Sequence, residues 1–304
     1  MRRGPSSNVT SASKLNAFYD FAGRALNTFL VHFVRRRKGP SGMKVGVIGL
    51  GTVGQAMTRQ FGRVAAVVGF DPADHDSYPE DALAECDFAV ICVNTPAAED
   101  GTCDSTKVFE AVSRVPVDRV LIKSTVAPGT TDRLITDTGK QICFSPEYLG
   151  ETGYNPWGSS AEGVPFVIVG GQPGARTWMM DRLVSVVGPD KTYLGCSAIE
   201  AEIIKYMENS FLATKVTFVN EFYEICQVFG VDWHTVREGW LLDPRVGRSH
   251  SAVFPENRGF SGKCLPKDVS AIVKAAGEAG YNPKLLSEVL ASNARFRQGN
   301  PQGN

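Results

Sequence analysis

A cysteine in the last third of the chain stands in a setting that favours nucleophilic chemistry. The segment Gly259-Phe-Ser-Gly-Lys-Cys264-Leu-Pro-Lys-Asp268 places it after a glycine-rich loop and between Lys263 and Lys267. Neighbouring cations lower the pKa of a thiol and favour the reactive thiolate. Asp268 faces the same site if a helix begins at the intervening proline. These features predict covalent chemistry at Cys264, whereas the other six cysteines suit buried, inert positions.

A cation and an amide stand one helical turn apart upstream of this segment. Lys205 and Asn209 lie within residues 197–229, a pattern without Gly or Pro that predicts one long helix. Their i, i+4 spacing places them on one face, where they could stabilise an oxyanion. Such a pair is also common on a solvated helix surface, so the residues alone leave both interpretations open.

A glycine-rich turn, Gly49-Leu-Gly51-Thr-Val53-Gly54, follows the first apolar run of the chain. In a strand–turn–helix setting, the glycines allow a tight turn, close approach of a pyrophosphate and close helix packing. Asp71, at the end of the second apolar run, is placed to bind a ribose 2′-hydroxyl and to repel a 2′-phosphate. This arrangement predicts a dinucleotide site that prefers NAD to NADP.

Two further apolar runs end in hydroxyl residues, Thr95 and Thr125. Parallel sheets place ligands at the carboxyl ends of their strands, so both threonines are predicted to line the cofactor cleft. Thr95 precedes a proline, which also fits an ordinary turn.

The elements that must position these residues change type midway along the chain. Short apolar runs predict strands at 44–48, 64–70, 88–93, 120–123, 141–144 and 165–169, where the series ends, with helical segments such as 55–62 and 107–114 between them. Helical patterns follow through residue 296. The predicted fold is α/β: a Rossmann-type doubly wound parallel sheet, then an all-helical central or dimerisation domain with a long spine helix. The predicted bounds are a basic extension 1–42, an NAD-binding domain 43–195, a helical domain 196–298 and a tail 299–304.

Composition narrows the class of protein. The chain has 304 residues, 43% of them hydrophobic, and no apolar stretch long enough to suggest a membrane span. The formal charge is zero, but residues 1–42 carry eight basic side chains and one acidic, which leaves an acidic body and argues against nucleic acid as a partner. Seven scattered cysteines fit a reducing, cytoplasmic location, and the histidines show no metal-ligand spacing. The extension is interpreted as dispensable sequence before Met43 rather than as a membrane-surface helix or an organelle address.

Taken in order, these segments resemble the UDP-glucose/GDP-mannose dehydrogenase family over about residues 43–298. The matching stretches are 45–54, 93–96, 123–131, 145–151, 202–221 and 259–268. The resemblance implies a double oxidation of a sugar C6 alcohol with two NAD+ at one site. Cys264 would capture the aldehyde as a thiohemiacetal, which becomes a thioester and is hydrolysed to the uronic acid.

The resemblance also implies the roles of individual residues. Lys205 and Asn209 would stabilise the oxyanion, Asp268 and Thr125 would position water or relay a proton, and Glu147 would serve thioester hydrolysis. The implied cofactor contacts are Gly49, Gly51, Val53, Gly54, Asp71, Thr95, Thr125, Glu151 and Lys267. The implied substrate contacts are Glu147, Tyr148, Leu149, Lys205, Asn209, Arg245, Phe254 and Ser261. Arg245 would reach the neighbouring subunit, which implies a homodimer with the long helix as its seam.

Several departures from the family bear on the substrate. Family members carry a further domain after the helical one that grips the nucleotide, and this chain stops where that domain would begin. A separate chain that supplies this surface, or a smaller substrate, would account for the difference. Ser261 stands where the family has glycine and would be strained at a positive φ. Thr152 and Phe166 replace a glycine and an arginine.

The expected substrate is UDP-glucose, with GDP-mannose and UDP-N-acetylmannosamine as alternatives. A truncated, non-catalytic NAD-binding or dimerising subunit stays open as a second interpretation. A third is a two-electron dehydrogenase of a small hydroxy acid, against which the segment from Cys264 to Asp268 argues.

Overall fold

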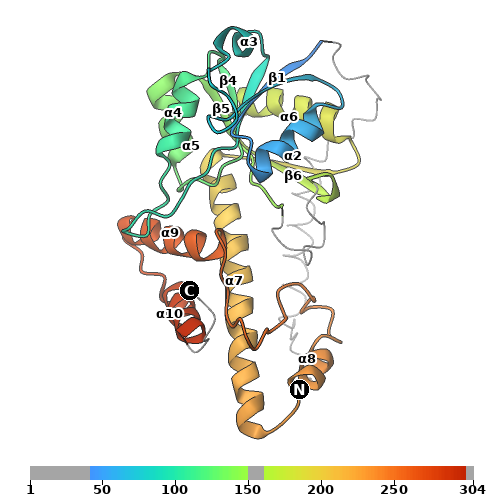
Figure 1. The fold of residues 1–304 in the computed structure, drawn as a ribbon, viewed down its shortest axis with the longest axis vertical. Helices are drawn as coiled ribbons and strands as arrows, with labels where there is room; N and C mark the ends of the chain where they lie inside the picture. The colour runs from blue at the N-terminus through green and yellow to red at the C-terminus, as the bar shows by residue number, and fades with distance from the viewer. Residues whose placement is uncertain (1–41, 150–160, 299–304) are drawn as a thin grey trace, which may run out of the picture. The chain divides into compact units, whose positions relative to one another are not determined.

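A seven-stranded sheet forms the first part of the chain in the computed structural model, which describes residues 42–149 and 161–298. Its strand order is β2-β1-β3-β4-β5-β6-β7. Figure 1 shows the sheet with the helices around it. The strands are β1 (Lys44–Ile48), β2 (Ala66–Phe70), β3 (Phe88–Ile91), β4 (Arg119–Ile122), β5 (Gln141–Phe144), β6 (Phe166–Gly171) and β7 (Thr192–Cys196). Neighbouring strands are parallel except β5 and β6, so the first five strands meet at one carboxyl edge.

Helices cover both faces of this sheet. They are α2 (Thr52–Phe61), α3 (Glu80–Ala84), α4 (Thr106–Arg114), α5 (Thr130–Thr138) and α6 (Pro173–Val187), with a 3-10 turn η1 (Ala161–Gly163). The alternation of side chains along β3 shows the two cores: Phe88 and Val90 join the cluster with α2 and α6, whereas Ala89 and Ile91 join the cluster with α4 and α5. All four are fully buried, which explains why the strands read as continuous apolar runs. The predicted doubly wound α/β sheet is confirmed.

Two details of the sheet differ from the prediction. The strand series does not end at residue 169, because β7 follows α6 and pairs parallel with β6. As an edge strand, β7 leaves most of its side chains partly or fully exposed, so its sequence lacks the apolar run that marks the other strands. In addition, β6 runs antiparallel to β5 through the pairs Cys143–Gly171 and Phe144–Gly170. The sheet is therefore mixed rather than purely parallel.

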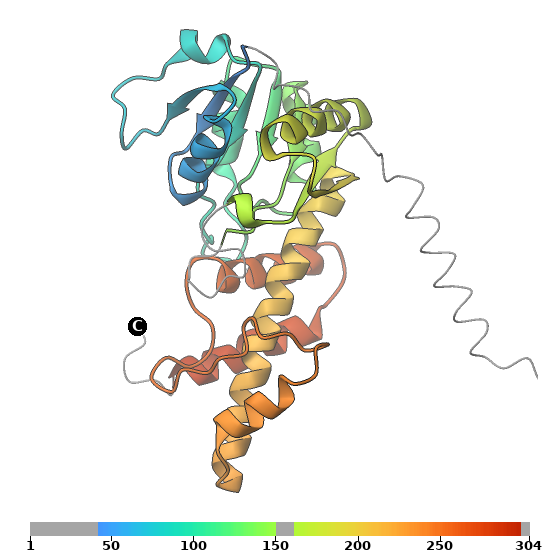
Figure 2. The ribbon, with the colours of Figure 1, turned by 90° about the vertical axis from the view of Figure 1, so that its right-hand side faces the viewer.

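The second part of the described chain is helical: α7 (Ala198–Phe229), α8 (Trp233–Trp240), α9 (Leu265–Glu278) and α10 (Lys284–Gln298). The 32-residue α7 confirms the predicted spine helix. Ser197 and Glu200 form a capping box at its start, and Gly230 in the left-handed conformation ends it. It packs against β6 of the sheet and against α9 and α10 (Figure 2).

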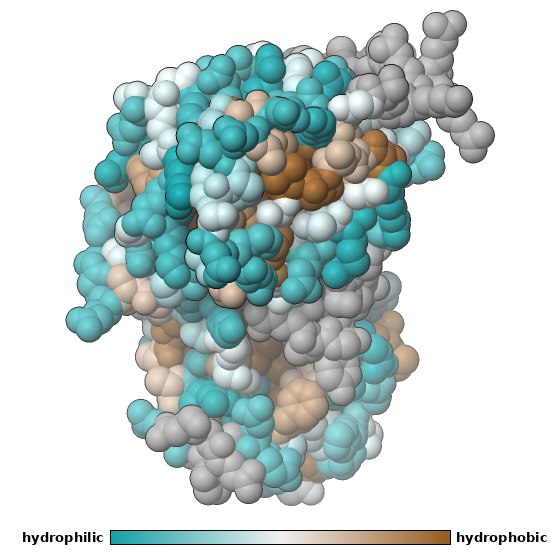
Figure 3. All heavy atoms as spheres, turned by 45° about the horizontal axis from the view of Figure 1, so that its top comes forward, coloured by the Kyte–Doolittle hydropathy of each residue, from teal (hydrophilic) through white to brown (hydrophobic). Residues whose placement is uncertain are grey.

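The surface of the sheet region is mostly hydrophilic on the face that Figure 3 shows, with an apolar area between the hydrophilic side chains. Within residues 42–149 and 161–298, no helix is long and apolar enough to cross a membrane. None of the seven cysteines, all of which lie within the described residues, forms a disulfide bond. The predicted tail and, apart from Gly42, the predicted basic extension lie outside the described residues, as do Glu151 and Thr152.

Candidate active site

The glycine-rich turn between β1 and α2 has the geometry that an anion site requires. Gly49 has a φ of +90°, and a Cβ there would lie 2.8 Å from the carbonyl of Cys92. A Cβ on Gly54 would lie 1.8 Å from the carbonyl oxygen of Gly49, so the turn tolerates no side chain there. Gly51 is exposed, has open space around its Cβ position and begins α2 without a side-chain cap. The first amides of α2, near Val53, are therefore available to a negatively charged ligand.

Asp71 ties the end of β2 to this turn. Its Oδ2 accepts a hydrogen bond from the amide of Leu50 at 2.8 Å, and its Oδ1 accepts one from the amide of Ala73 at 3.0 Å. These two amides hold the pKa of Asp71 below its ordinary value, so the carboxylate is charged. The predicted ribose-binding carboxylate thus lies beside the glycine-rich turn.

The two predicted threonines meet at the carboxyl edge of the sheet. The hydroxyl of Thr95 donates to the carbonyl of Thr125 at 2.8 Å, and the thiol of Cys103 donates to the same carbonyl at 3.4 Å. Cys103 also lies 4.0 Å from Lys267 Nζ on α9. Cys103 is buried, as predicted, and clusters with Tyr206 and Ala271. Its contacts with Thr125 and Lys267 link the segment after β4 to α9.

Lys205, Asn209 and Asp268 form one connected polar group between α7 and α9. Lys205 Nζ donates to Asn209 Oδ1 at 3.4 Å, and Asn209 Nδ2 donates to Asp268 Oδ2 at 2.5 Å. Lys267 Nζ lies 2.6 Å from the other oxygen of Asp268, which is almost fully buried. The predicted pair on α7 is therefore not a solvated surface pair, and the carboxylate of Asp268 fixes the orientation of the amide.

Electrostatics single out Lys205 within this group. Burial lowers its pKa, and the negative charges of Asp268 and Glu147 partly offset this effect. A thiolate at Cys264 acts in the same direction as these carboxylates, because its negative charge also raises the pKa of Lys205. An ammonium that is largely shielded from water interacts strongly with a developing alkoxide, because the local dielectric constant is low.

Cys264 occupies the N-cap position of α9, and its carbonyl accepts the amide of Asp268 at 2.8 Å. The residue is exposed, and a helix N-terminus stabilises a thiolate. Among residues 42–149 and 161–298, His250 is the only non-glycine residue with a positive φ. Ser261 therefore has a negative φ, and the backbone strain that a positive φ would cause there is absent.

Two asparagines hold the loop that precedes the cysteine. Asn293 of α10 accepts the amide of Phe260 at 2.7 Å and donates to its carbonyl at 3.0 Å. Asn220 of α7 accepts the amide of Gly259 at 3.1 Å. Neither asparagine was among the predicted site residues, because their only signal is an amide within an otherwise amphipathic helix.

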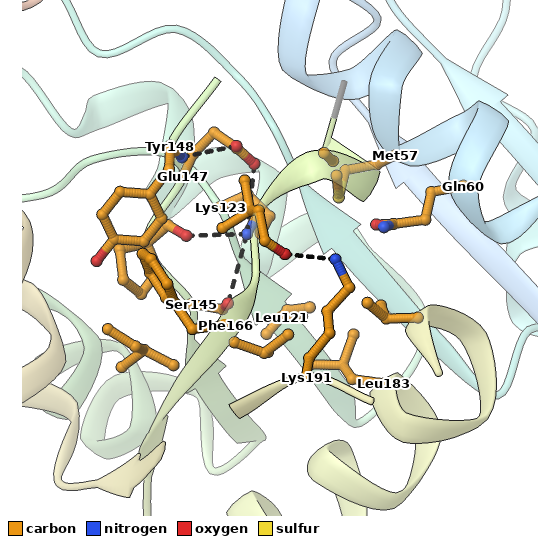
Figure 4. A pocket seen from close by; sticks show the side chains of 16 residues that line it. Met57, Gln60, Leu121, Lys123, Ser145, Glu147, Tyr148, Phe166, Leu183 and Lys191 are labelled. Carbon is orange, nitrogen blue, oxygen red and sulfur yellow. Dashed lines mark hydrogen bonds and ion pairs between the residues drawn. The ribbon is translucent and has the colours of Figure 1, made fainter. Parts of the chain in front are cut away.

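The loop after β5 carries three predicted residues, Glu147, Tyr148 and Leu149, and brings Tyr148 against Lys205. Glu147 Oε1 accepts the amides of Tyr148 at 2.7 Å and of Leu149 at 2.9 Å. The ring centroid of Tyr148 lies 5.1 Å from Lys205 Nζ. This loop lines a small cavity of about 50 Å³. Figure 4 shows the side chain of Lys123 beside Glu147 there. Lys123 was not predicted, although a lysine directly after an apolar strand run is an unusual feature that could have been noticed.

Two further predicted substrate residues, Arg245 and Phe254, lie at the surface. Arg245 is 88% exposed and pairs with Asp243, with Nη2 2.5 Å from its Oδ2. Phe254 is 48% exposed. The predicted contact of Arg245 with a neighbouring subunit stays a prediction, as does the role of Glu151.

Comparison with known proteins identifies the relatives of this chain. Residues 75–154 match the NAD binding domain of the UDP-glucose/GDP-mannose dehydrogenase family, and residues 199–295 match its central domain. A UDP-glucose 6-dehydrogenase of Haloferax volcanii is 32% identical over 70% of this chain and 53% of its own length. One from Pseudomonas aeruginosa is 31% identical over 72% of this chain and 51% of its own. The chain thus spans about half the length of the curated relatives it matches.

A solved structure agrees with these relatives. The UDP-glucose dehydrogenase of Pyrobaculum islandicum superimposes with a TM-score of 0.74 and 28% identity, over 88% of this chain and 71% of its own.

Proposed function

This chain belongs to the UDP-glucose/GDP-mannose dehydrogenase family, and from that premise we propose that it is an NAD-dependent nucleotide-sugar dehydrogenase. Its proposed reaction is the four-electron oxidation of the C6 alcohol of UDP-glucose to the carboxylate of UDP-glucuronate. The observation that carries the proposal is the connected group of Lys205, Asn209 and Asp268 at the start of the helix that Cys264 caps. A helix-held cation and amide, bonded to an aspartate one helical turn after an exposed cysteine, suit the stepwise oxidation of an alcohol through a covalent intermediate.

The proposed cofactor site lies at the carboxyl edge of the sheet. The turn from Gly49 to Gly54, together with Asp71, Thr95 and Lys267, would hold NAD+, which accepts the hydride that each oxidation releases. The open space at Gly51 and the uncapped start of α2 fit the pyrophosphate. Asp71 offers a charged carboxylate to ribose hydroxyls and excludes a 2′-phosphate by repulsion.

In the first oxidation, the C6 hydroxyl loses its proton towards the carboxylate of Asp268 while hydride leaves the same carbon. The oxygen becomes electron-rich as this happens, and Lys205 and Asn209 stabilise it. Both groups are pre-oriented: the amide by its 2.5 Å bond to Asp268 and the amine by the amide. The product is the C6 aldehyde.

In the second oxidation, the thiolate of Cys264 forms a C–S bond with the aldehyde carbon, and the carbonyl oxygen takes the negative charge of a thiohemiacetal. Loss of the remaining hydride restores the C=O bond as a thioester. Water then adds, the C–S bond breaks and the thiolate returns, with Glu147 accepting a proton from the water. One alcohol, two NAD+ and one water thus give one carboxylate, two NADH and three protons.

The test is NADH release with UDP-glucose, GDP-mannose and UDP-N-acetylmannosamine as substrates. We expect two NADH for each UDP-glucose, loss of the four-electron reaction in Cys264→Ser, and retained activity in Cys196→Ser, a matched change at a half-buried thiol. One NADH per substrate with free aldehyde would exclude the thioester step. A chain that binds NAD but turns over none of the sugars would instead be a non-catalytic, NAD-binding subunit.

We also propose a homodimer through α7. Apolar side chains recur on this helix at helical spacing and are 39–76% exposed: Ile199, Ile203, Met207, Phe211, Phe218, Phe222, Ile225 and Phe229. A second copy of the chain would cover such a stripe and bring Arg245 to the neighbouring site. Phe222→Glu should give monomers in sedimentation experiments. Mixing the variants Arg245→Ala and Cys264→Ser should recover activity, because one site of a mixed dimer is intact; no recovery would place Arg245 in its own subunit's site or in none.

A further inference from the structure

Lys123 lies under the loop that carries Glu147, at the carboxyl end of β4. Its amide donates to the carbonyl of Ile91 at 2.9 Å, which fixes the lysine backbone to β3. The loop is anchored nearby, because the amide of Ser145 donates to the carbonyl of Ile122 at 2.9 Å. Lysine and loop are therefore held by the same rigid part of the sheet.

The ammonium of Lys123 reaches three successive residues of this loop (Figure 4). It donates to the carbonyl of Pro146 at 3.1 Å and to the hydroxyl of Ser145 at 3.4 Å, and it lies 3.4 Å from Glu147 Oε2. The side chains of Lys123 and Glu147 are each only 11% exposed. A buried ion pair with additional hydrogen bonds has one preferred geometry, and removal of one partner leaves the other charge unpaired.

The two oxygens of Glu147 have different partners, so the carboxylate has a defined orientation. Oε1 accepts the amides of Tyr148 and Leu149, whereas Oε2 faces the ammonium of Lys123. Tyr148 in turn lies against Lys205, and the charge of Glu147 favours the protonated form of Lys205. The loop thus connects Lys123 to the polar group on α7.

We propose that Lys123 is a positioning residue that orients the carboxylate of Glu147 and holds the loop of residues 145–149 against Lys205. The kinetic consequence rests on the proposed function: Lys123 would act through Glu147 on the hydrolysis of the thioester and have little effect on the two hydride transfers. The structural consequence, an ordered loop, does not depend on any activity.

The same cavity offers a matched control. Lys191 also lines it, but its ammonium donates to the carbonyls of Glu162 and Val164, and no hydrogen bond or ion pair within the described residues joins it to Glu147. Lys191→Met therefore removes a lysine and its carbonyl contacts from the same cavity without changing the partners of Glu147.

The first experiment measures hydrogen exchange of the amides of Tyr148 and Leu149 in the full chain. We expect Lys123→Met to speed their exchange by about tenfold or more, because the carboxylate that accepts them loses its counterion, and Lys191→Met to leave them unchanged. Unchanged exchange in Lys123→Met, or equal effects of both variants, would overturn the proposal. If Lys123→Met does not fold, Lys123→Gln, which keeps a donor but not the charge, takes its place.

The second experiment tests the coupling to Glu147. With UDP-glucose and NAD+, Lys123→Met should form NADH in a rapid burst, turn over about 10- to 100-fold more slowly afterwards, and accumulate a covalent sugar adduct detectable by mass spectrometry of the intact chain. In a Glu147→Gln background, Lys123→Met should add less than about twofold, since both changes then affect the same step. Additive effects would make Lys123 a merely structural residue. If the native chain forms no NADH, the proposed function fails, and the exchange experiment alone decides the positioning role.

Discussion

The carboxylate of Glu202 on α7 accepts two hydrogen bonds from Thr131 on α5, one from the amide at 2.9 Å and one from the hydroxyl at 2.6 Å. A third comes from the amide of Gly129 at 2.6 Å. Glu202 is fully buried, and the amides belong to the start of α5, where a helix favours a negative charge. Burial raises the pKa of Glu202, and the bonds from Thr131 and Gly129 oppose this shift. This contact joins the helical part of the chain to the sheet.

Removal of this carboxylate should destabilise the chain. Glu202→Ala leaves the amides of Gly129 and Thr131 buried without their acceptor, and we expect a loss of about 2–4 kcal/mol in the free energy of unfolding. Glu221→Ala removes an exposed carboxylate from the same helix and should change it by less than about 0.5 kcal/mol. Urea denaturation measures both. A loss below about 1 kcal/mol in Glu202→Ala would show that solvent satisfies these amides.

The alkaline limb of the activity profile should report the protonation of Lys205. Burial lowers its pKa from the ordinary value of 10.5, while Asp268 raises it. Because the protonated amine stabilises the oxyanion, activity should fall as pH rises through a value below 10.5. Asp268→Asn removes the opposing charge, so this limb should move to lower pH, whatever the height of the profile. A limb that stays in place would assign it to another group.

The loop before Cys264 should depend on Asn293. Asn293→Ala leaves the amide and the carbonyl of Phe260 without their partner, and we expect a loss of about 1–3 kcal/mol in stability and slower labelling of Cys264 by substrate. Asn293→Asp keeps the acceptor and loses the donor, so its effect should be intermediate. Urea denaturation measures the stability, and single-turnover kinetics measure the labelling of Cys264. Equal stability of the native chain, Asn293→Ala and Asn293→Asp would contradict this role.

Cofactor preference should follow Asp71. Asp71→Ala removes the ribose acceptor and also frees the amide of Leu50, so the Kd of NAD should rise about tenfold or more. The discrimination against NADP should shrink, because the repulsion of a 2′-phosphate is lost. Calorimetric titration with both dinucleotides measures the ratio. An unchanged NAD/NADP ratio would show that Asp71 serves the turn alone.

The sequence predicts those parts of the structure that depend on local spacing. Buried strands such as 88–91 appear as apolar runs, and the i, i+4 spacing places Lys205 and Asn209 together. The edge strand 192–196 has no such run, and the antiparallel entry of β6 depends on pairing that no local pattern encodes. Contacts across large sequence separations are equally invisible: Lys123 meets Glu147, and Asn293 meets Phe260, only because the fold brings them together.

Gly51 and Gly54 stand in the same short turn, but folding requires a glycine only at position 54, whereas the proposed dinucleotide binding requires one at position 51. A methyl group at position 54 would overlap the backbone of Gly49, so every substitution there is eliminated when the chain folds. A methyl group at position 51 meets nothing within 4 Å, so the empty protein should accept alanine there without loss. A library sorted first for folded chains and then for dinucleotide capture would therefore lose diversity at position 54 in the first round and at position 51 only in the second.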